Sequence, residues 1–120
     1  MKYILIIYGN QELWDSFDPG QYAELIRGTE ALNAELAASG ELIGAYGLAD
    51  QVQARTVRIR DDVPAVTDGP YIEAKEYLAS FTIVDCEGLE RALEIAAKNP
   101  AAVYGQVEVR PILHEAGVEM

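Results

Sequence analysis

The sequence has 120 residues, of which 50% are hydrophobic, and its 20 acidic and 9 basic side chains give a formal net charge of −11. This length and apolar content suit one domain with its own core, so we expect a single domain over residues 1–120. The acidic balance would repel phosphate backbones and anionic lipid, which argues against nucleic acid and membrane surfaces as partners. The single cysteine, Cys86, cannot form an intrachain disulfide, and no Cys/His cluster indicates zinc, so we expect a cytoplasmic protein without a metal or other cofactor.

The first part of the chain predicts a strand followed by a helix. Residues 3–8 are apolar on both faces, which is typical of a central strand, and the run is far too short to cross a bilayer. Asp18 and Gln21 form a capping-box pattern around Pro19, which favours a helix start at this point. Apolar residues then recur at three- and four-residue spacing until Gly40, which is suited to end a helix.

The middle of the chain predicts a second strand and an inserted hairpin. Residues 42–48 return as a strand, and the segment 50–75 that follows is additional to a plan of two strand-helix-strand units. Within this segment, residues 56–60 alternate between polar and apolar side chains, which indicates a strand with one solvent-exposed face. The pair Asp61-Asp62 favours a turn, and residues 63–67 are expected to run back beside the first strand of the hairpin.

The second half of the chain repeats the strand-helix-strand pattern. Residues 78–84 predict a strand, residues 87–98 a helix that Asn99-Pro100 stops, and residues 103–109 a closing strand. The helix is expected to bury Leu89, Leu93 and Ala96. Two such units indicate an α+β fold with the ferredoxin-like β-α-β-β-α-β plan and an inserted hairpin. Right-handed crossovers would place both helices on the same face of the sheet.

The other face of the sheet is expected to lack helices. On the closing strand, the side chains alternate between an apolar set (Val103, Gly105, Val107 and Val109) and a polar set (Tyr104, Gln106, Glu108 and Arg110). If the valines meet the helices, the opposite face carries the polar set beside apolar residues of the central strands. Such a face is rarely left in water, so we expect a homodimer formed by sheet-on-sheet packing.

The most unusual stretch is Asp68-Gly-Pro-Tyr-Ile-Glu-Ala-Lys-Glu76, a turn tripeptide followed by charged residues. In a structural interpretation it forms a sharp turn, with Asp68 capping nearby N–H groups and the other charges solvated. In a functional interpretation Asp68 and Glu76 are paired catalytic carboxylates for proton transfer. The sequence leaves both interpretations open.

Four further residues are predicted to bind a polar substrate. Glu108 and Arg110 share a strand face, where they form either a structural ion pair or a ligand site in which Arg110 holds a carboxylate. Arg58 on the inserted hairpin is a weaker candidate for the same task. Tyr46 on the second strand is the fourth, although strand tyrosines more often belong to a core or an interface.

Three motifs in order resemble the DGPF branch of the YCII-related proteins. They are Asp68-Gly-Pro-Tyr-Ile-Glu-Ala-Lys-Glu76, Ala96-Ala-Lys-Asn-Pro100 and Gly105-Gln-Val-Glu-Val-Arg-Pro111, with Tyr71 standing where that branch usually has phenylalanine. The resemblance implies a ferredoxin-like domain that pairs into a dimeric α/β barrel. The wider family is described as enzymes around a His and Asp pair, but the corresponding helix region here reads Ile26-Arg-Gly-Thr-Glu30, so that mechanism is not carried over.

Two functional hypotheses follow. The first is a dimer that binds a small polar organic compound, either as a binding protein or as an enzyme that performs acid/base chemistry on that compound. The alternative is a non-catalytic interaction or regulatory module, which the resemblance associates with sigma-factor or stress systems because some relatives of the branch are encoded beside sigma factors. The missing histidine favours the alternative, and the charged residues on a covered sheet face favour the first.

Overall fold

The computed structural model describes residues 1–71 and 75–116, which form a four-stranded sheet, a layer of helices and a separate hairpin. The elements are β1 (Lys2–Asn10), α1 (Gln11–Ser16), α2 (Pro19–Ser39), β2 (Leu42–Gly47), the 3-10 turn η1 (Gln51–Gln53), β3 (Arg55–Arg60), β4 (Val63–Asp68), β5 (Glu76–Asp85), α3 (Leu89–Lys98), α4 (Ala101–Tyr104) and β6 (Val107–Pro111). The sheet has the order β2-β5-β1-β6, and every neighbouring pair is antiparallel. This is an α+β fold, and its strand order is compatible with the ferredoxin-like plan.

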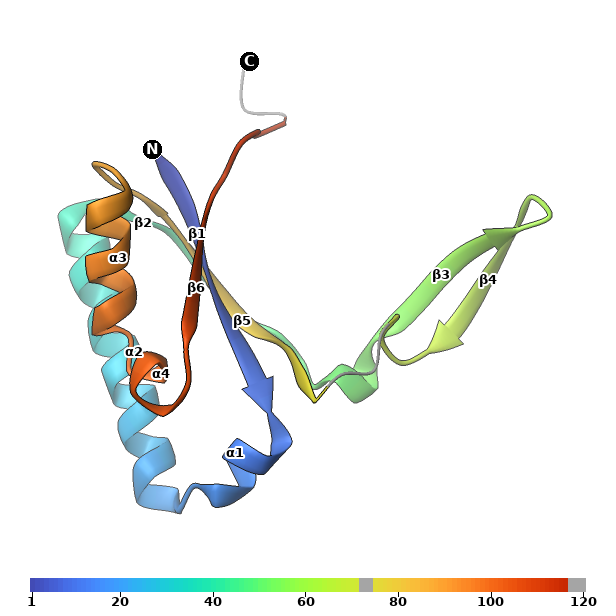
Figure 1. The fold of residues 1–120 in the computed structure, drawn as a ribbon, viewed down its shortest axis with the longest axis horizontal. Helices are drawn as coiled ribbons and strands as arrows, with labels where there is room; N and C mark the ends of the chain where they lie inside the picture. The colour runs from blue at the N-terminus through green and yellow to red at the C-terminus, as the bar shows by residue number, and fades with distance from the viewer. Residues whose placement is uncertain (72–74, 117–120) are drawn as a thin grey trace.

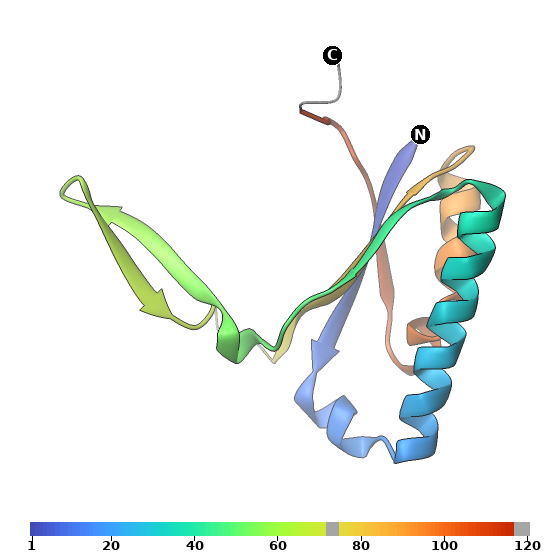
Figure 2. The same cartoon turned by 180° about the vertical axis from the view of Figure 1, so that it is seen from behind.

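The helices α2 and α3 cover one face of the sheet, as predicted, and the core lies between the two layers (Figures 1 and 2). Its largest fully buried side chains come from β1, α2, β5 and α3: Leu5, Leu36, Val84 and Ile95. None of the described helices is long and apolar enough to cross a membrane.

The limits of α2 follow the predicted signals. The side chain of Asp18 accepts a hydrogen bond from the backbone N–H of Gln21 at 2.8 Å, and the Gln21 side chain accepts one from the N–H of Asp18 at 3.0 Å. At the other end Gly40 has a φ of 83°, in the left-handed region that glycine adopts without strain. The predicted capping box and the predicted glycine cap are both confirmed.

An ion pair fastens the start of β2 to α3. Arg91 donates to both carboxylate oxygens of Glu41, from Nε at 2.9 Å and from Nη2 at 2.8 Å. These hydrogen bonds lower the pKa of Glu41 to about 2, and a bond from the hydroxyl of Ser39 contributes in the same direction. Folding with the Arg91 ion pair therefore favours the charged form of Glu41.

Two sequence predictions about the second unit are wrong. The helix α3 begins at Leu89 rather than at residue 87, and it buries Ala92, Ile95 and Ala96, while Leu89 and Leu93 are about half exposed (51% and 50%). The small side chain of Ala92 lets the helix approach the sheet closely on a stripe that the leucines flank.

The closing strand is also shorter than predicted. Residues 101–104 form the helical turn α4, so Val103 and Tyr104 belong to a helix and β6 starts at Val107. The cause is local: the side chain of Asn99 accepts a hydrogen bond from the N–H of Ala101 at 2.9 Å and so begins a new turn directly after α3 ends.

At Gly28 the helix α2 makes a close approach to the turn between α3 and α4. A Cβ atom at position 28 would lie 2.6 Å from Cγ of Pro100, closer than side-chain atoms come in practice. A glycine in a helix interior costs about 1 kcal/mol relative to alanine. In α2 the missing side chain of Gly28 leaves the space that the ring of Pro100 occupies.

The inserted hairpin is confirmed, and we call it the arm (residues Arg55–Asp68). Its strands β3 and β4 pair in register from Arg55 opposite Asp68 to Arg60 opposite Val63. Asp61 and Asp62 have φ values of 50° and 63°, the positive values that a two-residue type I′ turn requires. The arm projects away from the sheet on the side opposite the helices (Figures 1 and 2). The radius of gyration is accordingly 16.7 Å, whereas a compact chain of this length has about 14 Å.

Candidate functional site

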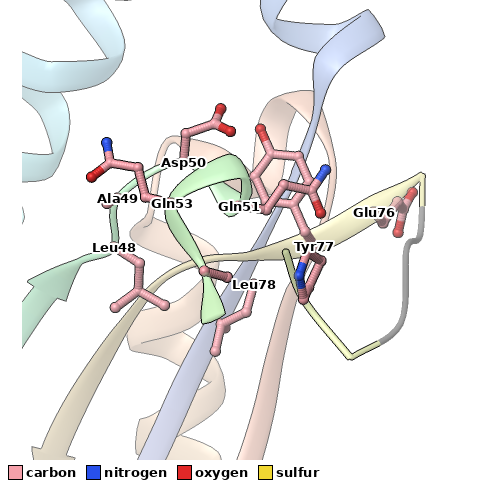
Figure 3. A pocket seen from close by; sticks show the side chains of 10 residues that line it. Leu48, Ala49, Asp50, Gln51, Gln53, Glu76, Tyr77 and Leu78 are labelled. Carbon is pink, nitrogen blue, oxygen red and sulfur yellow. The ribbon is translucent and has the colours of Figure 1, made fainter. Parts of the chain in front are cut away.

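A cleft of about 580 Å³ lies at the base of the arm, where the end of β2, the turn η1 and the start of β5 meet (Figure 3). Its lining residues are Leu48, Ala49, Asp50, Gln51, Gln53, Ala54, Pro70, Glu76, Tyr77 and Leu78. Small-molecule sites commonly have volumes of about 300–1,000 Å³. The cleft therefore has room for a small organic compound.

Short-range hydrogen bonds hold the wall of the cleft that η1 provides. The carboxylate of Asp50 accepts from the N–H of Val52 at 2.9 Å and so starts the turn, and the N–H of Ala54 closes it on the carbonyl of Gln51 at 3.0 Å. Leu48 is fixed by its N–H, which donates to the carbonyl of Ala79 on β5 at 2.9 Å.

The predicted motif closes the base of the arm. The N–H of Gly69 donates to the carbonyl of Ala54 at 2.8 Å, and the hydroxyl of Thr56 donates to the carbonyl of Gly69 at 2.9 Å. Gly69 has a φ of 91°, which explains why a glycine stands there. This part of the motif thus has a structural task, while its residues 72–74 lie outside the described residues.

One polar atom of the lining is buried without a partner. The Oε1 atom of Gln51 is shielded from solvent, and no group of the described residues lies within hydrogen-bonding distance of it. The hydroxyl of Tyr77 is by contrast engaged, because it accepts a hydrogen bond from Nε1 of Trp14 at 3.1 Å. Neither Gln51 nor Tyr77 was predicted as a site residue, since neither belongs to a sequence motif.

The charge of the lining is one-sided. The described residues of the lining include two acidic side chains, Asp50 and Glu76, and two glutamines, and none of these described residues is basic. The remaining wall is mostly aliphatic. The cleft thus combines apolar surface with hydrogen-bond acceptors, a lining that suits a ligand with an apolar body and a donor group.

The structure places the two predicted catalytic carboxylates differently. Glu76 lines the cleft and accepts a long hydrogen bond from Nε2 of Gln106 at 3.5 Å. Asp68 is almost fully exposed at the end of β4, where its Oδ1 lies 3.1 Å from Nε of Arg55, and it does not line the cleft. Neither position tests the proton-transfer role, which stays a prediction for both.

Lys75, beside Glu76, is held by α1. Its Nζ lies 2.8 Å from Oε2 of Glu12, and this hydrogen bond raises the pKa of Lys75 and lowers that of Glu12. Both side chains are well exposed. This contact positions the chain at the point where it enters β5.

Three of the predicted substrate-binding residues lie on the sheet face that the helices leave uncovered, which we call the bare face. Two rows cross all four strands on this face: Tyr46-Phe81-Ile6-Glu108 and Gly44-Ile83-Ile4-Arg110. The bare face is therefore apolar over its centre and charged at the β6 edge. This agrees with the predicted direction of Glu108 and Arg110, since Val107 and Val109 pack against the core.

The polar residues of the bare face contact one another. The hydroxyl of Tyr8 donates to Oε1 of Glu108 at 3.3 Å, and Nε of Arg110 lies 3.6 Å from Oε2 of the same carboxylate. At the other edge Tyr46 packs on Phe81 with ring centroids 5.2 Å apart, and its ring covers Gly44.

The fourth predicted residue, Arg58, lies on the arm, where its guanidinium carbon stands 5.3 Å above the centre of the Tyr71 ring. The predicted site residues therefore fall into three places, namely the cleft, the bare face and the arm.

Comparison with known proteins gives a consistent family assignment without a described activity. The chain is 28% identical over 114 residues to an uncharacterised protein of Rhizobium meliloti (strain 1021), a match that covers 93% of this chain and 92% of that protein. The family model of the YCII-related domain matches residues 1–116. Because this match extends over nearly the whole chain, the chain belongs to the YCII-related domain family.

Proposed function

We propose that this protein binds a small organic molecule in the cleft at the base of the arm. The observation that carries the proposal is the buried, unpaired Oε1 of Gln51 in a cleft of about 580 Å³. A buried polar atom without a partner costs about 1–3 kcal/mol, so native proteins rarely retain one without a reason. Because the Gln51 side chain lines the cleft, a turn of its amide would bring this oxygen to a ligand that donates a hydrogen bond, and that bond would recover the cost.

The lining defines the chemical class of the ligand. Leu48 and Leu78 offer apolar contact, while Asp50, Gln51 and Glu76 offer acceptors. We propose a compact molecule with an apolar body and an amine, amide or hydroxyl donor. An anionic ligand is disfavoured here, because the cleft has two carboxylates and no basic side chain.

The acid/base activity predicted from the sequence finds its support in Glu76. Glu76 is one of the residues that line the cleft, and a carboxylate at this position can accept a proton from the donor group of a bound ligand. We propose Glu76 as the proton-transfer group of any reaction in the cleft.

We further propose that the protein is a homodimer in which two bare faces pack together, as in a dimeric α/β barrel. The support is the row of apolar side chains across the bare face, which includes Phe81 and the half-exposed Tyr46. Contact between two such faces would remove this apolar surface from water. The Glu108 and Arg110 pair would then lie at the edge of the interface and fix its register.

The binding proposal is tested by a thermal-shift screen of small amines, amides and phenols at millimolar concentration. We expect some compounds to raise the melting temperature of the wild type and of Gln53→Met, but not of Gln51→Met. Gln53→Met is the matched control, because Gln53 lies in the same turn and lines the same cleft but is exposed. A screen without hits, or hits that Gln51→Met leaves intact, would contradict the proposal.

A further inference from the structure

The arm exposes an apolar face that nothing in the described chain covers. On one face of the hairpin Val57 stands opposite Val66, and Ile59 opposite Pro64. The exposed fractions of Val57, Ile59 and Val66 are 61%, 65% and 63%. These side chains are at cross-strand positions, so they form one continuous strip along the arm.

A two-stranded hairpin of this kind is at best marginally stable in water on its own. The type I′ turn and the cross-strand pairs favour the hairpin locally, but both strands have a free edge and the apolar strip is solvated. Long, exposed apolar edges are sites at which other chains bind. The arm therefore needs a surface to pack on, and its own sheet lies only at its base (Figure 1).

The charges of the arm balance one another. Arg58 and Arg60 lie together on the face opposite the strip, and within residues 1–71 and 75–116 neither has a carboxylate within 4.0 Å. The arm has three arginines in all (Arg55, Arg58 and Arg60) and three aspartates (Asp61, Asp62 and Asp68), so it carries no net charge on a chain whose net charge is −11. The acidic body of a second copy of this chain therefore does not repel the arm, and charge does not oppose packing of the strip on that body.

The position of the arm indicates a second copy of this chain as the surface on which it packs. It leaves the molecule on the side of the bare face, away from α2 and α3 (Figures 1 and 2). A copy that packs on the bare face lies on the side to which the arm extends, and six residue pairs reach about 20 Å. Twofold symmetry would bury both arms at once, because each copy offers the same surfaces.

We infer that the arm docks on a second copy of this chain, with the strip of Val57, Ile59 and Val66 against that copy. The inference rests on the proposed dimer and deepens it, because it gives the arm a task in that assembly. The cleft lies at the base of the arm, so docking also fixes the wall that η1 and Pro70 provide.

The test compares dimer dissociation constants by analytical ultracentrifugation across a dilution series. In the double variant Val57→Thr/Val66→Thr the β-branched shape is retained and only the apolar character of the strip is lost. The control is Val63→Thr, the same change at a valine of the arm that is also exposed but lies on the opposite face. We expect the double variant to weaken the dimer on the order of tenfold, and the control to leave it unchanged.

A second measurement locates the arm directly. A spin label on Asp62→Cys in a Cys86→Ala background, mixed with unlabelled isotope-enriched protein, should broaden amide signals of the other subunit. A wild-type dimer that shows no such broadening and no effect of the double variant would overturn the inference while leaving the dimer intact, and the strip would then be free for a different protein. A wild type that stays monomeric would overturn the dimer and the inference together, and the ligand screen would remain an independent test of the cleft.

Discussion

The substitution Gln51→Met tests whether the unpaired amide oxygen of Gln51 destabilises the ligand-free protein. Methionine has nearly the same length as glutamine and no buried oxygen, so it removes the unpaired Oε1 while it keeps the side chain in place. An unsatisfied buried acceptor costs about 1–3 kcal/mol, of which some is offset by contacts that the amide group makes. We expect the ligand-free variant to be more stable than the wild type by about 1 kcal/mol, which for a domain of this size raises the melting temperature by about 4 °C.

Calorimetry and urea unfolding of the ligand-free protein measure this difference. The control Gln53→Met should change the free energy of unfolding by less than about 0.5 kcal/mol, since Gln53 is exposed. If Gln51→Met instead lowers the free energy of unfolding by about 1 kcal/mol or more, the amide oxygen has a partner within the protein. That result would contradict the proposal that a ligand supplies its missing hydrogen bond.

Three further predictions concern the fold. The pKa of Glu41 is held at about 2, so the Arg91 pair stabilises the folded state fully above the unfolded value of about 4.5 and loses this effect as pH falls toward 2; urea midpoints of the wild type and Glu41→Gln should therefore differ at pH 7 and converge near pH 2. Ile95→Ala should lower the free energy of unfolding by about 2–5 kcal/mol, because Ile95 is fully buried and a cavity remains, and a change below 1 kcal/mol would show that α3 is loosely packed. Asp18→Ala should cost about 1 kcal/mol through loss of the capping box with Gln21, as measured by thermal unfolding, whereas Asp18→Ser should restore most of the loss.

The elements that could be predicted from the sequence are those with local signals. Asp18 and Gly40 mark the limits of α2, because a cap depends only on residues within a turn or two. The turn at Asp61-Asp62 was likewise predictable, since short polar side chains tolerate positive φ. Alternation also placed Glu108 and Arg110 on the face away from the helices.

The errors arose where tertiary packing decides. Leu89 and Leu93 match a helical apolar stripe, yet α3 turns its alanine side to the sheet, since close packing there favours a small residue. Val103 and Tyr104 have the composition of a strand, but the hydrogen bond from the N–H of Ala101 to Asn99 starts a helical turn first. Single-residue propensity cannot resolve either competition.

The cleft was harder to predict than the fold. Its lining joins the segment from Leu48 to Ala54 with Tyr77 and Leu78, which are more distant in the sequence and meet that segment through the pairing of β2 with β5. Charged residues attracted attention in the sequence, whereas the most informative side chain is an uncharged amide. Only Glu76 was both predicted and found in the cleft.

The close approach of Gly28 to Pro100 links the two sides of the sheet mechanically. Pro100 leads through α4 into β6, the strand that carries Glu108 and Arg110. A methyl group at position 28 would push this connection outward, and we expect β6, an edge strand that pairs with β1 only, to take up part of the displacement. We therefore expect the substitution Gly28→Ala to shift Glu108 and Arg110 at the β6 edge of the bare face, although residue 28 lies on the helix side of the sheet.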